Sequence, residues 1–555
     1  MKMNRSCHEH DPDAEGSLMP LLERAVLRRA VDNVANWGDT DIFPYPVENQ
    51  VFHDRPEPVV DLLENIAVNF ESEINSFPVG SYSTLAPVGY TGFRWATQIE
   101  PVWNAYLLAT VLSLAPEIEK ARLGEGMDKV FSYRYRPETT DGSLFALDSW
   151  SRFQETTRNL AEGHDYVVAV DIGDFYARIY HHRLENALQA VDQGATKTKH
   201  IMAILKRLSN NTSYGLPVGG PAARILAELV LNRVDHLLIT DPTMSVFCRY
   251  ADDYRFFVND IQTAYKSIGL LSEKLLRNEG LTLQKSKTRI LKSSEYLSVL
   301  DPPNPPPGSA GAFLNLHIHY DPYSATADED YERLQDQLNE FDILSLLRDE
   351  LVKGRIDSAL TRRLVQALRY LEARPREQAV LSLLESIATL APVIPQVMMA
   401  IRDCTSDLDP DFVDTVHARI RQLIQDHHYV AQIDLNLAFM IRVLATKHST
   451  ENELLLIQLY QSPHGFGSSP APNVQRDIML ALARWGVTYW LSDQKNYIST
   501  APIWVKRAFI VGSYTLGDEG KYWRDANKPS MNAFDIIMRD WVADRRQDQS
   551  WQVPI

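Results

Sequence analysis

The chain has few cysteines and no long apolar run. Only three cysteines occur among its 555 residues, at Cys7, Cys248 and Cys404, and this wide separation excludes a disulfide framework. No apolar segment reaches the ~18–20 residues needed to cross a bilayer. The opening MKMNRSCHEHDPDAEG lacks the apolar core of a secretory signal. We therefore expect a cytoplasmic protein without a membrane partner.

An excess of basic residues is also lacking. The 56 Lys and Arg against 72 Asp and Glu give a net charge of −16. Because phosphate binding needs clustered Lys and Arg, this balance excludes a protein that coats nucleic acid indiscriminately. Two local basic clusters, at 197–207 and 274–292, leave a basic channel open. A solvated helix face is the alternative for each cluster.

A proline-rich stretch divides the chain. Residues 300–311 read LDPPNPPPGSAG, which continues neither a helix nor a central strand. Before it, strand and helix patterns alternate, and we expect an α+β domain at 21–325 with helices on one face of its sheet. After it, apolar residues recur at helical spacing, and we expect an all-α, solenoid-like domain at 326–555. Residues 1–20 are predicted to be a disordered tail.

The α+β domain has a clear order of predicted elements. A strand opens residues 164–180, and a helix over 221–239 starts at a proline. A hairpin covers 245–258, and an amphipathic helix over 264–280 ends at a glycine. A further strand covers 281–291.

Three carboxylates mark the ends of these predicted strands. Asp171 ends an apolar strand, and Asp252 and Asp253 lie together at the tip of the apolar hairpin CRYADDYRFFV. Neighbouring strand ends would form an oxygen-rich site suited to Mg²⁺, with the carbonyl of Ile172 as a further ligand. Two such ions support in-line phosphoryl transfer. An ordinary acidic turn is the alternative for the Asp–Asp pair taken alone.

Four ordered motifs carry a family resemblance. DIGDFYARIY, GLPVGGPAARILAE, RYADDYRFFV and GLTLQKSKTRIL resemble the successive palm motifs of reverse transcriptases, and residues 93–112 and 130–137 resemble the fingers motifs before them. The resemblance covers roughly 50–295. The helical remainder resembles that of bacterial defence-associated, abortive-infection (AbiK-like, "unknown group") reverse transcriptases. The resemblance of the palm motifs implies a right-hand-type fingers and palm domain, with Asp171, Asp252 and Asp253 catalytic and Mg²⁺ (or Mn²⁺) as cofactor.

The resemblance also implies the nucleotide-binding residues. Tyr176 matches the aromatic gate that excludes a ribose 2′-hydroxyl, and the adjacent Phe175 is expected to pack in the core beside it. Asp174 matches a backbone contact to the triphosphate, Arg94 the fingers arginine that grips it, and Lys287 a lysine near the leaving pyrophosphate. Solvated lysine is the alternative for that last residue. Pro217 and Gly219 match the loop that approaches the incoming nucleotide.

Three residues are expected to face nucleic acid. Gly215 allows close approach of the template, and Arg134 and Arg136 alternate with tyrosines as on a strand with one basic face. Surface arginines on an edge strand are the alternative for Arg136. The chain departs from the family at Val218, where many members have glutamine, and in the absence of lysine from residues 83–92. Both departures leave template use and triphosphate binding open.

The expected activity is that of an RNA-directed DNA polymerase acting on dNTPs in antiphage defence. Synthesis without a template and priming from a protein side chain fit the departures above. Templated copying of a partner non-coding RNA is one alternative. A non-catalytic, nucleotide-sensing assembly protein that acts through its helical half is another, and self-association into a homo-oligomer is expected. A mixed-charge surface explains the basic residues near residue 507 better than nucleic-acid contact does.

Overall fold

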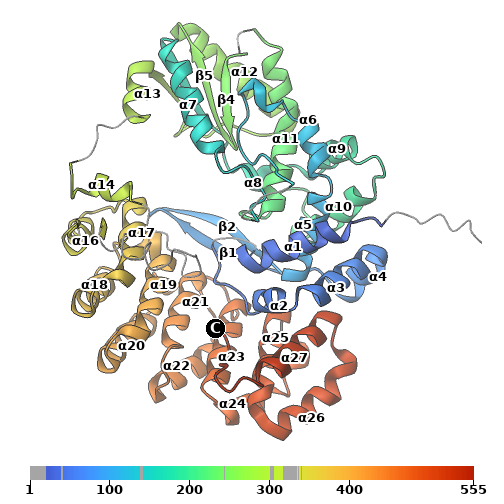
Figure 1. Ribbon diagram of the computed structural model, residues 1–555, viewed down its shortest axis with the longest axis vertical. Coiled ribbons are helices and arrows are strands. Elements are labelled where there is room, and N and C mark those ends of the chain that lie inside the picture. The colour runs from blue at the N-terminus through green and yellow to red at the C-terminus, as the bar shows by residue number, and fades with distance from the viewer. Residues whose placement is uncertain are drawn as a thin grey trace, which may run out of the picture.

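The computed structural model describes residues 20–38, 42–137, 142–242, 244–300, 306–316, 334, 337–338 and 340–555. Figure 1 shows an upper part built around a sheet, a lower part made of helices, and a two-stranded hairpin between them. The tail expected at 1–20 lies, except for its last residue, outside the described residues. The domain boundary expected at 325–326 lies outside them too.

The N-terminal region consists of helices and one hairpin. In the hairpin, β1 (Ser81–Val88) and β2 (Gly92–Ile99) pair antiparallel. The next helix, α5 (Pro101–Leu112), is apolar on nearly every side, as expected of a helix in which every residue is buried. Glu100 caps this helix, accepting a hydrogen bond from the Trp103 amide at 3.0 Å. The helices before the hairpin are α1 (Arg24–Trp37), α2 (Glu48–Asp54), α3 (Pro56–Val68) and α4 (Phe70–Ser76).

The upper part contains a four-stranded antiparallel sheet in the order β4-β5-β3-β6. Its strands are β3 (Tyr166–Asp171), β4 (Phe247–Tyr250), β5 (Asp253–Val258) and β6 (Arg289–Lys292). Its helices are α6 (Ala115–Ala121), α7 (Ser149–Glu162), α8 (Phe175–Arg178), α9 (His181–Val191), α10 (Thr196–Leu208), α11 (Pro221–Ile239), α12 (Ile261–Glu279) and α13 (Ser293–Leu300). We call this part the palm.

The predicted order of palm elements is confirmed, with two corrections. Helix α12 ends at Gly280, whose φ of 71° is the left-handed conformation expected of a helix-terminating glycine. The strand expected over 281–291 is confined to its C-terminal end, Arg289–Lys292. Helices also cover both faces of the sheet rather than one. Val167 and Phe257 pack towards α7 and α13, whereas α12 contacts β3 and β5 across the other face.

The lower part is helical throughout its described residues. Odd-numbered helices from α17 to α27 contact one another in series, and even-numbered helices from α16 to α22 form a second series. Two such rows are typical of helical solenoids, and assignment to that class remains a prediction. The helices are α14 (Ala310–Leu314), α16 (Ile343–Leu351), α17 (Ser358–Ala367), α18 (Ala373–Glu385), α19 (Ile394–Cys404), α20 (Pro410–Gln425), α21 (Asp434–Leu444), α22 (Thr450–Gln461), α23 (Pro472–Arg484), α24 (Thr488–Gln494), α25 (Ile503–Gly512), α26 (Gly517–Asn527) and α27 (Ala533–Arg545).

The helical half contacts the N-terminal hairpin. Tyr82 and Thr84 of β1 both donate hydrogen bonds to Asp434 at the start of α21. The fully buried Arg507 of α25 contacts Glu100 at 2.5 Å and Asp535 at 3.2 Å. For Arg507, this burial contradicts both the mixed-charge surface that was expected and the nucleic-acid contact that was its alternative. The hairpin therefore joins the two halves through polar contacts.

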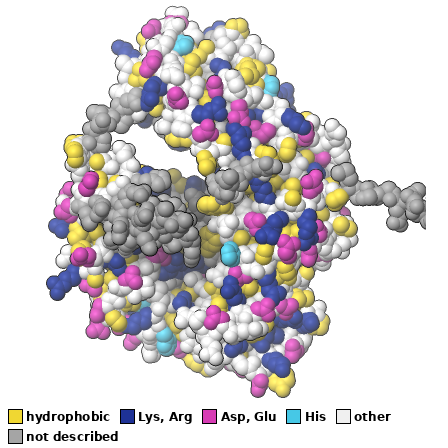
Figure 2. All heavy atoms as spheres, viewed as in Figure 1, with side chains coloured by type: hydrophobic (Ala, Val, Ile, Leu, Met, Phe, Trp, Pro, Cys, Tyr) yellow, Lys and Arg dark blue, Asp and Glu magenta, His cyan; other side chains and the backbone are white. Residues whose placement is uncertain are grey.

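The surface carries mixed charge. Figure 2 shows Lys and Arg side chains interspersed with Asp and Glu over the face it presents. Within the described ranges, no helix has both the length and the apolar character needed to cross a membrane.

Candidate functional site

The three predicted carboxylates meet at one edge of the palm sheet. Asp171 is the last residue of β3 and pairs in register with Asp253, the first residue of β5. Asp252 lies in the turn between β4 and β5, and its carbonyl accepts a hydrogen bond from the Ile172 amide at 3.2 Å. The turn is tight, because Tyr250 pairs directly with Asp253. Two residues therefore close the hairpin and present the acidic pair at its tip.

Ala251 holds this turn in an uncommon conformation. Its φ is 51°, in the left-handed region that side chains with a Cβ seldom adopt. Such a residue costs about 1 kcal/mol or more and persists only where its surroundings fix it. Ala251 is itself buried, with 8% of its surface exposed. The turn before the two aspartates is therefore held by its surroundings and is not a loose surface loop.

Lys287 faces Asp171 from the segment after α12. Its Nζ lies 2.8 Å from Asp171 Oδ2, and this contact raises the pKa of Lys287. The backbone attaches the same turn to β3, because the Gln284 amide donates to the Asp171 carbonyl at 2.7 Å. Lys287 thus has a partner in Asp171, although its side chain remains 64% exposed, and its role at the leaving pyrophosphate stays a prediction.

Asp252 is harder to ionise than an ordinary aspartate. Burial, then the charge of Asp171 and that of Asp253, raise its pKa to about 6, and Lys287 offsets only part of this. The cluster is thus short of positive charge as it stands. Carboxylates in this condition suit a divalent cation, which would relieve the repulsion. The carboxylate oxygens suit Mg²⁺ by their chemistry, although among the described residues no group of three His, Cys, Asp or Glu side chains is placed to hold a metal ion.

The raised pKa of Asp252 predicts a pH-dependent stability difference. The folded protein keeps the Asp252 proton up to about pH 6, whereas an unfolded chain loses it near pH ~3.9. Stability contributed by this group therefore falls as the pH rises between these values. We expect the free energy of unfolding of Asp252→Asn to rise by about 1–2 kcal/mol relative to the wild type across this pH window, and the difference to persist at pH 7. Urea unfolding of both proteins from pH 4 to pH 7 measures it, and a constant difference would contradict it.

A cleft of about 700 Å³ lies between the hairpin and the palm. It is lined by β2, by α8 with the residues before it, and by the loop that precedes α11. Six of the predicted nucleotide- or nucleic-acid-binding residues line it, namely Arg94, Asp174, Phe175, Tyr176, Gly215 and Pro217. Gly219 and Lys287 lie outside its lining. The sequence motifs are thus brought to one concave surface beside the carboxylates.

The cleft residues differ in solvent exposure and in whether their side chains have partners. Phe175 is buried with 4% exposed, as expected for a core residue, while Tyr176 is partly exposed beside it. Arg94 is exposed, and its side chain has no hydrogen-bond or ion-pair partner among the described residues. Asp174 is exposed and lies 3.9 Å from Arg178. The cleft therefore offers a guanidinium and a tyrosine to a ligand.

The loop before α11 depends on its glycines. Gly215 and Gly219 have φ values of 98° and 112°, which residues with a Cβ rarely adopt. The Leu216 amide donates to the Tyr176 carbonyl at 2.9 Å, which ties this loop to α8. The two motifs, distant in sequence, thus form one wall of the cleft.

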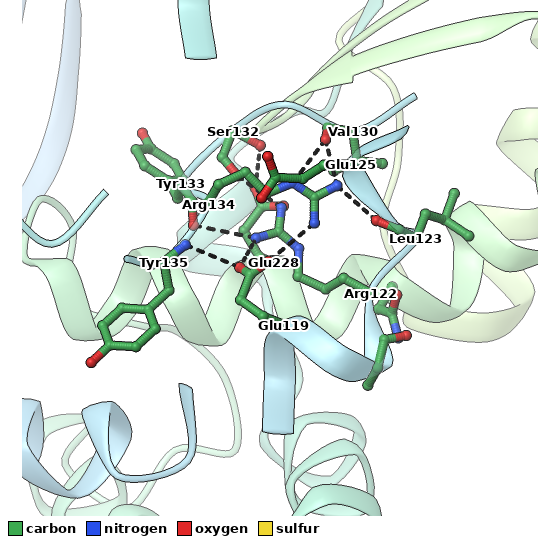
Figure 3. Close-up of polar contacts among 12 residues, drawn as sticks. Glu119, Arg122, Leu123, Glu125, Val130, Ser132, Tyr133, Arg134, Tyr135 and Glu228 are labelled. Atoms are coloured by element: carbon green, nitrogen blue, oxygen red, sulfur yellow. Dashed lines mark hydrogen bonds and ion pairs between the residues drawn. The ribbon is translucent and has the colours of Figure 1, made fainter. Parts of the chain in front are cut away.

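The expectation of a basic strand at 130–137 is wrong. This segment is irregular, and Arg134 is only 3% exposed. Its guanidinium donates to the carbonyls of Val130 and Leu123 and pairs with Glu119 at 3.1 Å (Figure 3). Arg134 therefore cannot face nucleic acid. The reason is that its donors satisfy carbonyls of a segment without regular structure.

Arg136 is also held within the protein. It pairs with Glu125 at 2.7 Å, and its side chain is 36% exposed. The paired carboxylate lowers its value as a phosphate contact, which favours the alternative of a surface arginine. A role for Arg136 in nucleic-acid binding remains a prediction.

A buried ionic cluster, which the sequence patterns did not predict, lies beneath the acidic turn. Arg249 of β4 pairs with Glu228 and Asp235 of α11, and none of the three is more than 2% exposed. A signal was present, because Arg249 stands inside an otherwise apolar strand and the two acids lie seven positions apart on an apolar helix. Buried charges of this kind require partners.

Comparison with known proteins agrees with the palm geometry. Residues 118–300 match the family described as reverse transcriptase (RNA-dependent DNA polymerase). A search of curated proteins returned no match. Among solved structures, the chain is similar to telomerase from Candida albicans in complex with a fragment of telomeric RNA, at 10% identity and a TM-score of 0.30, over 77% of this chain and 74% of that one. It is similar to apo telomerase from Candida tropicalis at 11% identity and a TM-score of 0.31, over 71% and 73%.

Similarities at these TM-scores do not bear on function. The family match does, because it spans the whole palm sheet, the acidic turn, the glycine loop and Lys287. The chain therefore carries, in residues 118–300, a nucleotidyltransferase domain of the reverse transcriptase type.

Proposed function

We propose that the protein is a DNA polymerase that adds dNTPs to a 3′-hydroxyl at Asp171, Asp252 and Asp253. One observation carries the proposal. The register of β3 and β5 sets Asp171 opposite Asp253, with Asp252 in the connecting turn, inside the segment that matches reverse transcriptases. The cleft beside them supplies room for a nucleotide.

The three carboxylates, with the Ile172 carbonyl, would hold two Mg²⁺ ions, and Mn²⁺ would substitute. When bound, such ions stabilise the attacking and leaving oxygens of phosphoryl transfer. In the reaction, the 3′-hydroxyl would lose its proton to solvent, and its oxygen would form a bond to the α-phosphorus. The bond from the α-phosphorus to the oxygen that bridges to the β-phosphorus would break, and pyrophosphate would leave. Lys287 is mostly exposed beside Asp171, so it can turn from that carboxylate to the departing phosphate.

Tyr176 is proposed to select the sugar. It lines the cleft and lies five residues after Asp171, in the short helix α8 that follows the end of β3. We expect Tyr176→Ala to increase rNTP incorporation relative to dNTP by about 10-fold or more, because the space for a 2′-hydroxyl opens.

The matched control is Tyr214→Ala, since Tyr214 is a tyrosine on the same cleft with 55% of its surface exposed. Single-nucleotide incorporation kinetics with paired dNTP and rNTP measure the ratio. Equal ratios in the two variants would remove Tyr176 from this role.

The mode of synthesis is proposed to be template-independent and protein-primed. The support is Val218 in place of the family glutamine, in the loop that lines the cleft. Templated copying of a partner non-coding RNA is the second candidate, favoured by the match of residues 118–300 to a family described as RNA-dependent DNA polymerase. A non-catalytic nucleotide sensor is the third, favoured by the size of the helical half.

One set of reactions separates these candidates. The purified protein is incubated with each labelled dNTP and Mg²⁺, before and after nuclease treatment and with or without added template. Homopolymer attached to the protein after nuclease treatment supports template-free, protein-primed synthesis. A defined sequence that disappears with a co-purifying RNA supports templated copying. Absence of product in every reaction supports the sensor.

The biological setting belongs to the same proposal. Its support is the resemblance of the helical half to defence-associated reverse transcriptases, which implies a cytoplasmic homo-oligomer acting against phage. Plating phage on cells that express the wild type or Asp253→Asn tests it. Equal protection by both would dissociate defence from polymerisation.

A further inference from the structure

The ionic cluster beneath the acidic turn touches two parts of the proposed active site. Arg249 Nη1 donates to the carbonyl of Ala251 at 2.9 Å, one residue before Asp252. The remaining guanidinium donors reach Asp235 at 2.6 and 2.9 Å and Glu228 at 2.9 and 3.1 Å. All five N–H groups of Arg249 are therefore used, and one of them fixes the strained turn residue.

Glu228 receives hydrogen bonds from a second direction. Ser132 Oγ donates to it at 2.6 Å, and Arg122 Nη2 donates to it at 2.6 Å (Figure 3). Burial opposes ionisation of Glu228, but Arg249 and Arg122 outweigh it and hold its pKa below the usual value. The carboxylate is thus charged and shared between the turn and the segment containing Ser132.

The residue after Ser132 faces the proposed sugar gate. Tyr133 has a φ of 47°, its ring centroid lies 6.2 Å from that of Tyr250 beside the acidic turn, and it is close enough to Tyr176 for the two residues to shift each other's pKa. Arg224 covers the Tyr133 ring at 5.2 Å from its centroid. A shift of this short segment would therefore move a residue that neighbours both the acidic turn and Tyr176.

Stability alone does not explain four buried charges here. Buried ion pairs often contribute no more than apolar residues of the same volume, and they are better suited to fixing one arrangement. The cluster also balances in charge, with two arginines and two acids, and Tyr254 satisfies Asp235 further at 3.2 Å. The cluster is hydrogen-bonded to the acidic turn through Arg249 and the Ala251 carbonyl, and to the segment before Tyr133 through Glu228 and Ser132.

We propose that Arg249 and Glu228 are positioning residues that hold the acidic turn and the Tyr133–Tyr176 pair in one rigid frame. Arg249 fixes the turn through the Ala251 carbonyl. Glu228 fixes the gate through Ser132. The inference rests on the proposed polymerase function and adds to it the prediction that catalysis and sugar selection depend on one buried carboxylate.

Three variants separate the two branches. Arg249→Lys keeps the charge but offers three donors in place of five, so we expect kcat to fall about 10- to 100-fold with KM for dNTP changed less than threefold. Ser132→Ala removes only the gate branch, so we expect dNTP over rNTP selection to fall several-fold at near-normal kcat. Glu228→Gln is expected to show both defects.

The control is Arg442→Lys, which alters a buried Arg–Asp pair of 2.6 Å in the helical half. It is expected to lose thermal stability to a similar degree with kcat within about twofold. Losses of kcat that follow Tm equally in Arg249→Lys and Arg442→Lys would overturn the proposal. So would unchanged selection in both Ser132→Ala and Glu228→Gln.

A binding measurement keeps the inference separate from the polymerase proposal. Mn²⁺ titration followed by electron paramagnetic resonance reports on the carboxylates without turnover. We expect Arg249→Lys to weaken Mn²⁺ binding about 10-fold or more, and Arg442→Lys to leave it unchanged. An inactive wild type with this difference intact would reject the polymerase and retain the positioning role. Equal Mn²⁺ binding by wild type and Arg249→Lys would reject the positioning role.

Discussion

Asp252→Asn is expected to lower kcat for nucleotide incorporation by about 10³-fold or more while leaving the fold more stable at pH 7. The amide keeps the shape of the side chain but removes a charge that burial, Asp171 and Asp253 all disfavour. Catalysis needs that charge for the cation, whereas folding does not. Activity and stability should therefore change in opposite directions. Single-turnover incorporation and urea unfolding of the same preparations measure both.

A control keeps this result specific. Asp241→Asn removes an acidic charge elsewhere in the palm, near Lys274, and is expected to retain activity within about twofold. Activity within tenfold of the wild type for Asp252→Asn would contradict its assignment. A loss of both activity and stability would point instead to a structural aspartate.

Arg507→Ala is expected to destabilise the protein by about 3–5 kcal/mol, because it leaves buried carboxylates without a partner. The Arg507 side chain is fully buried between Glu100, Glu48 and Asp535. Its guanidinium also lies 4.5 Å from the centroid of the Phe534 ring. Glu48 belongs to α2, Glu100 caps α5 and Asp535 belongs to α27, so the change is expected to weaken the contact between the N-terminal helices and the helical half. Chemical unfolding measures the loss.

The neighbouring Lys506→Ala is the matched control, since Lys506 is only partly buried. We expect that change to cost about 0.5 kcal/mol or less. A cost below about 1 kcal/mol for Arg507→Ala would show that the buried cluster does not join the halves.

A further expectation is that Arg507→Ala lowers nucleotide incorporation, because the β1–β2 hairpin that carries Arg94 loses its support.

Local patterns in the palm predicted its elements well. The helix starting at Pro221, the glycine that ends α12 and the hairpin around the aspartates all depend on residues close in sequence. The meeting of Asp171 with Asp253 also followed from the order of apolar strands. Such features are encoded by spacing and by residue type, so a single sequence suffices to infer them.

Long-range partners could not be inferred in the same way. Arg134 alternates with tyrosines as a basic strand would, yet the irregular backbone folds back so that Glu119 and the carbonyls of Leu123 and Val130, which lie only 4 to 15 positions away, bind its donors. Arg507 follows Lys506 in an otherwise apolar stretch, and its partner Glu100 lies 407 positions away. A buried and an exposed arginine look alike until their partners are known. The same ambiguity hid the role of Arg249 beneath the turn.

The most direct test of the account is incorporation of α-³²P-labelled dNTP by the purified wild type in Mg²⁺, beside the Asp252→Asn and Asp253→Asn variants. Formation of acid-insoluble label by the wild type, lost by about 10³-fold or more in both variants, is the predicted result. Label formed equally by the wild type and both variants, or by none of the three in Mg²⁺ or Mn²⁺, would contradict a polymerase active site at Asp171, Asp252 and Asp253.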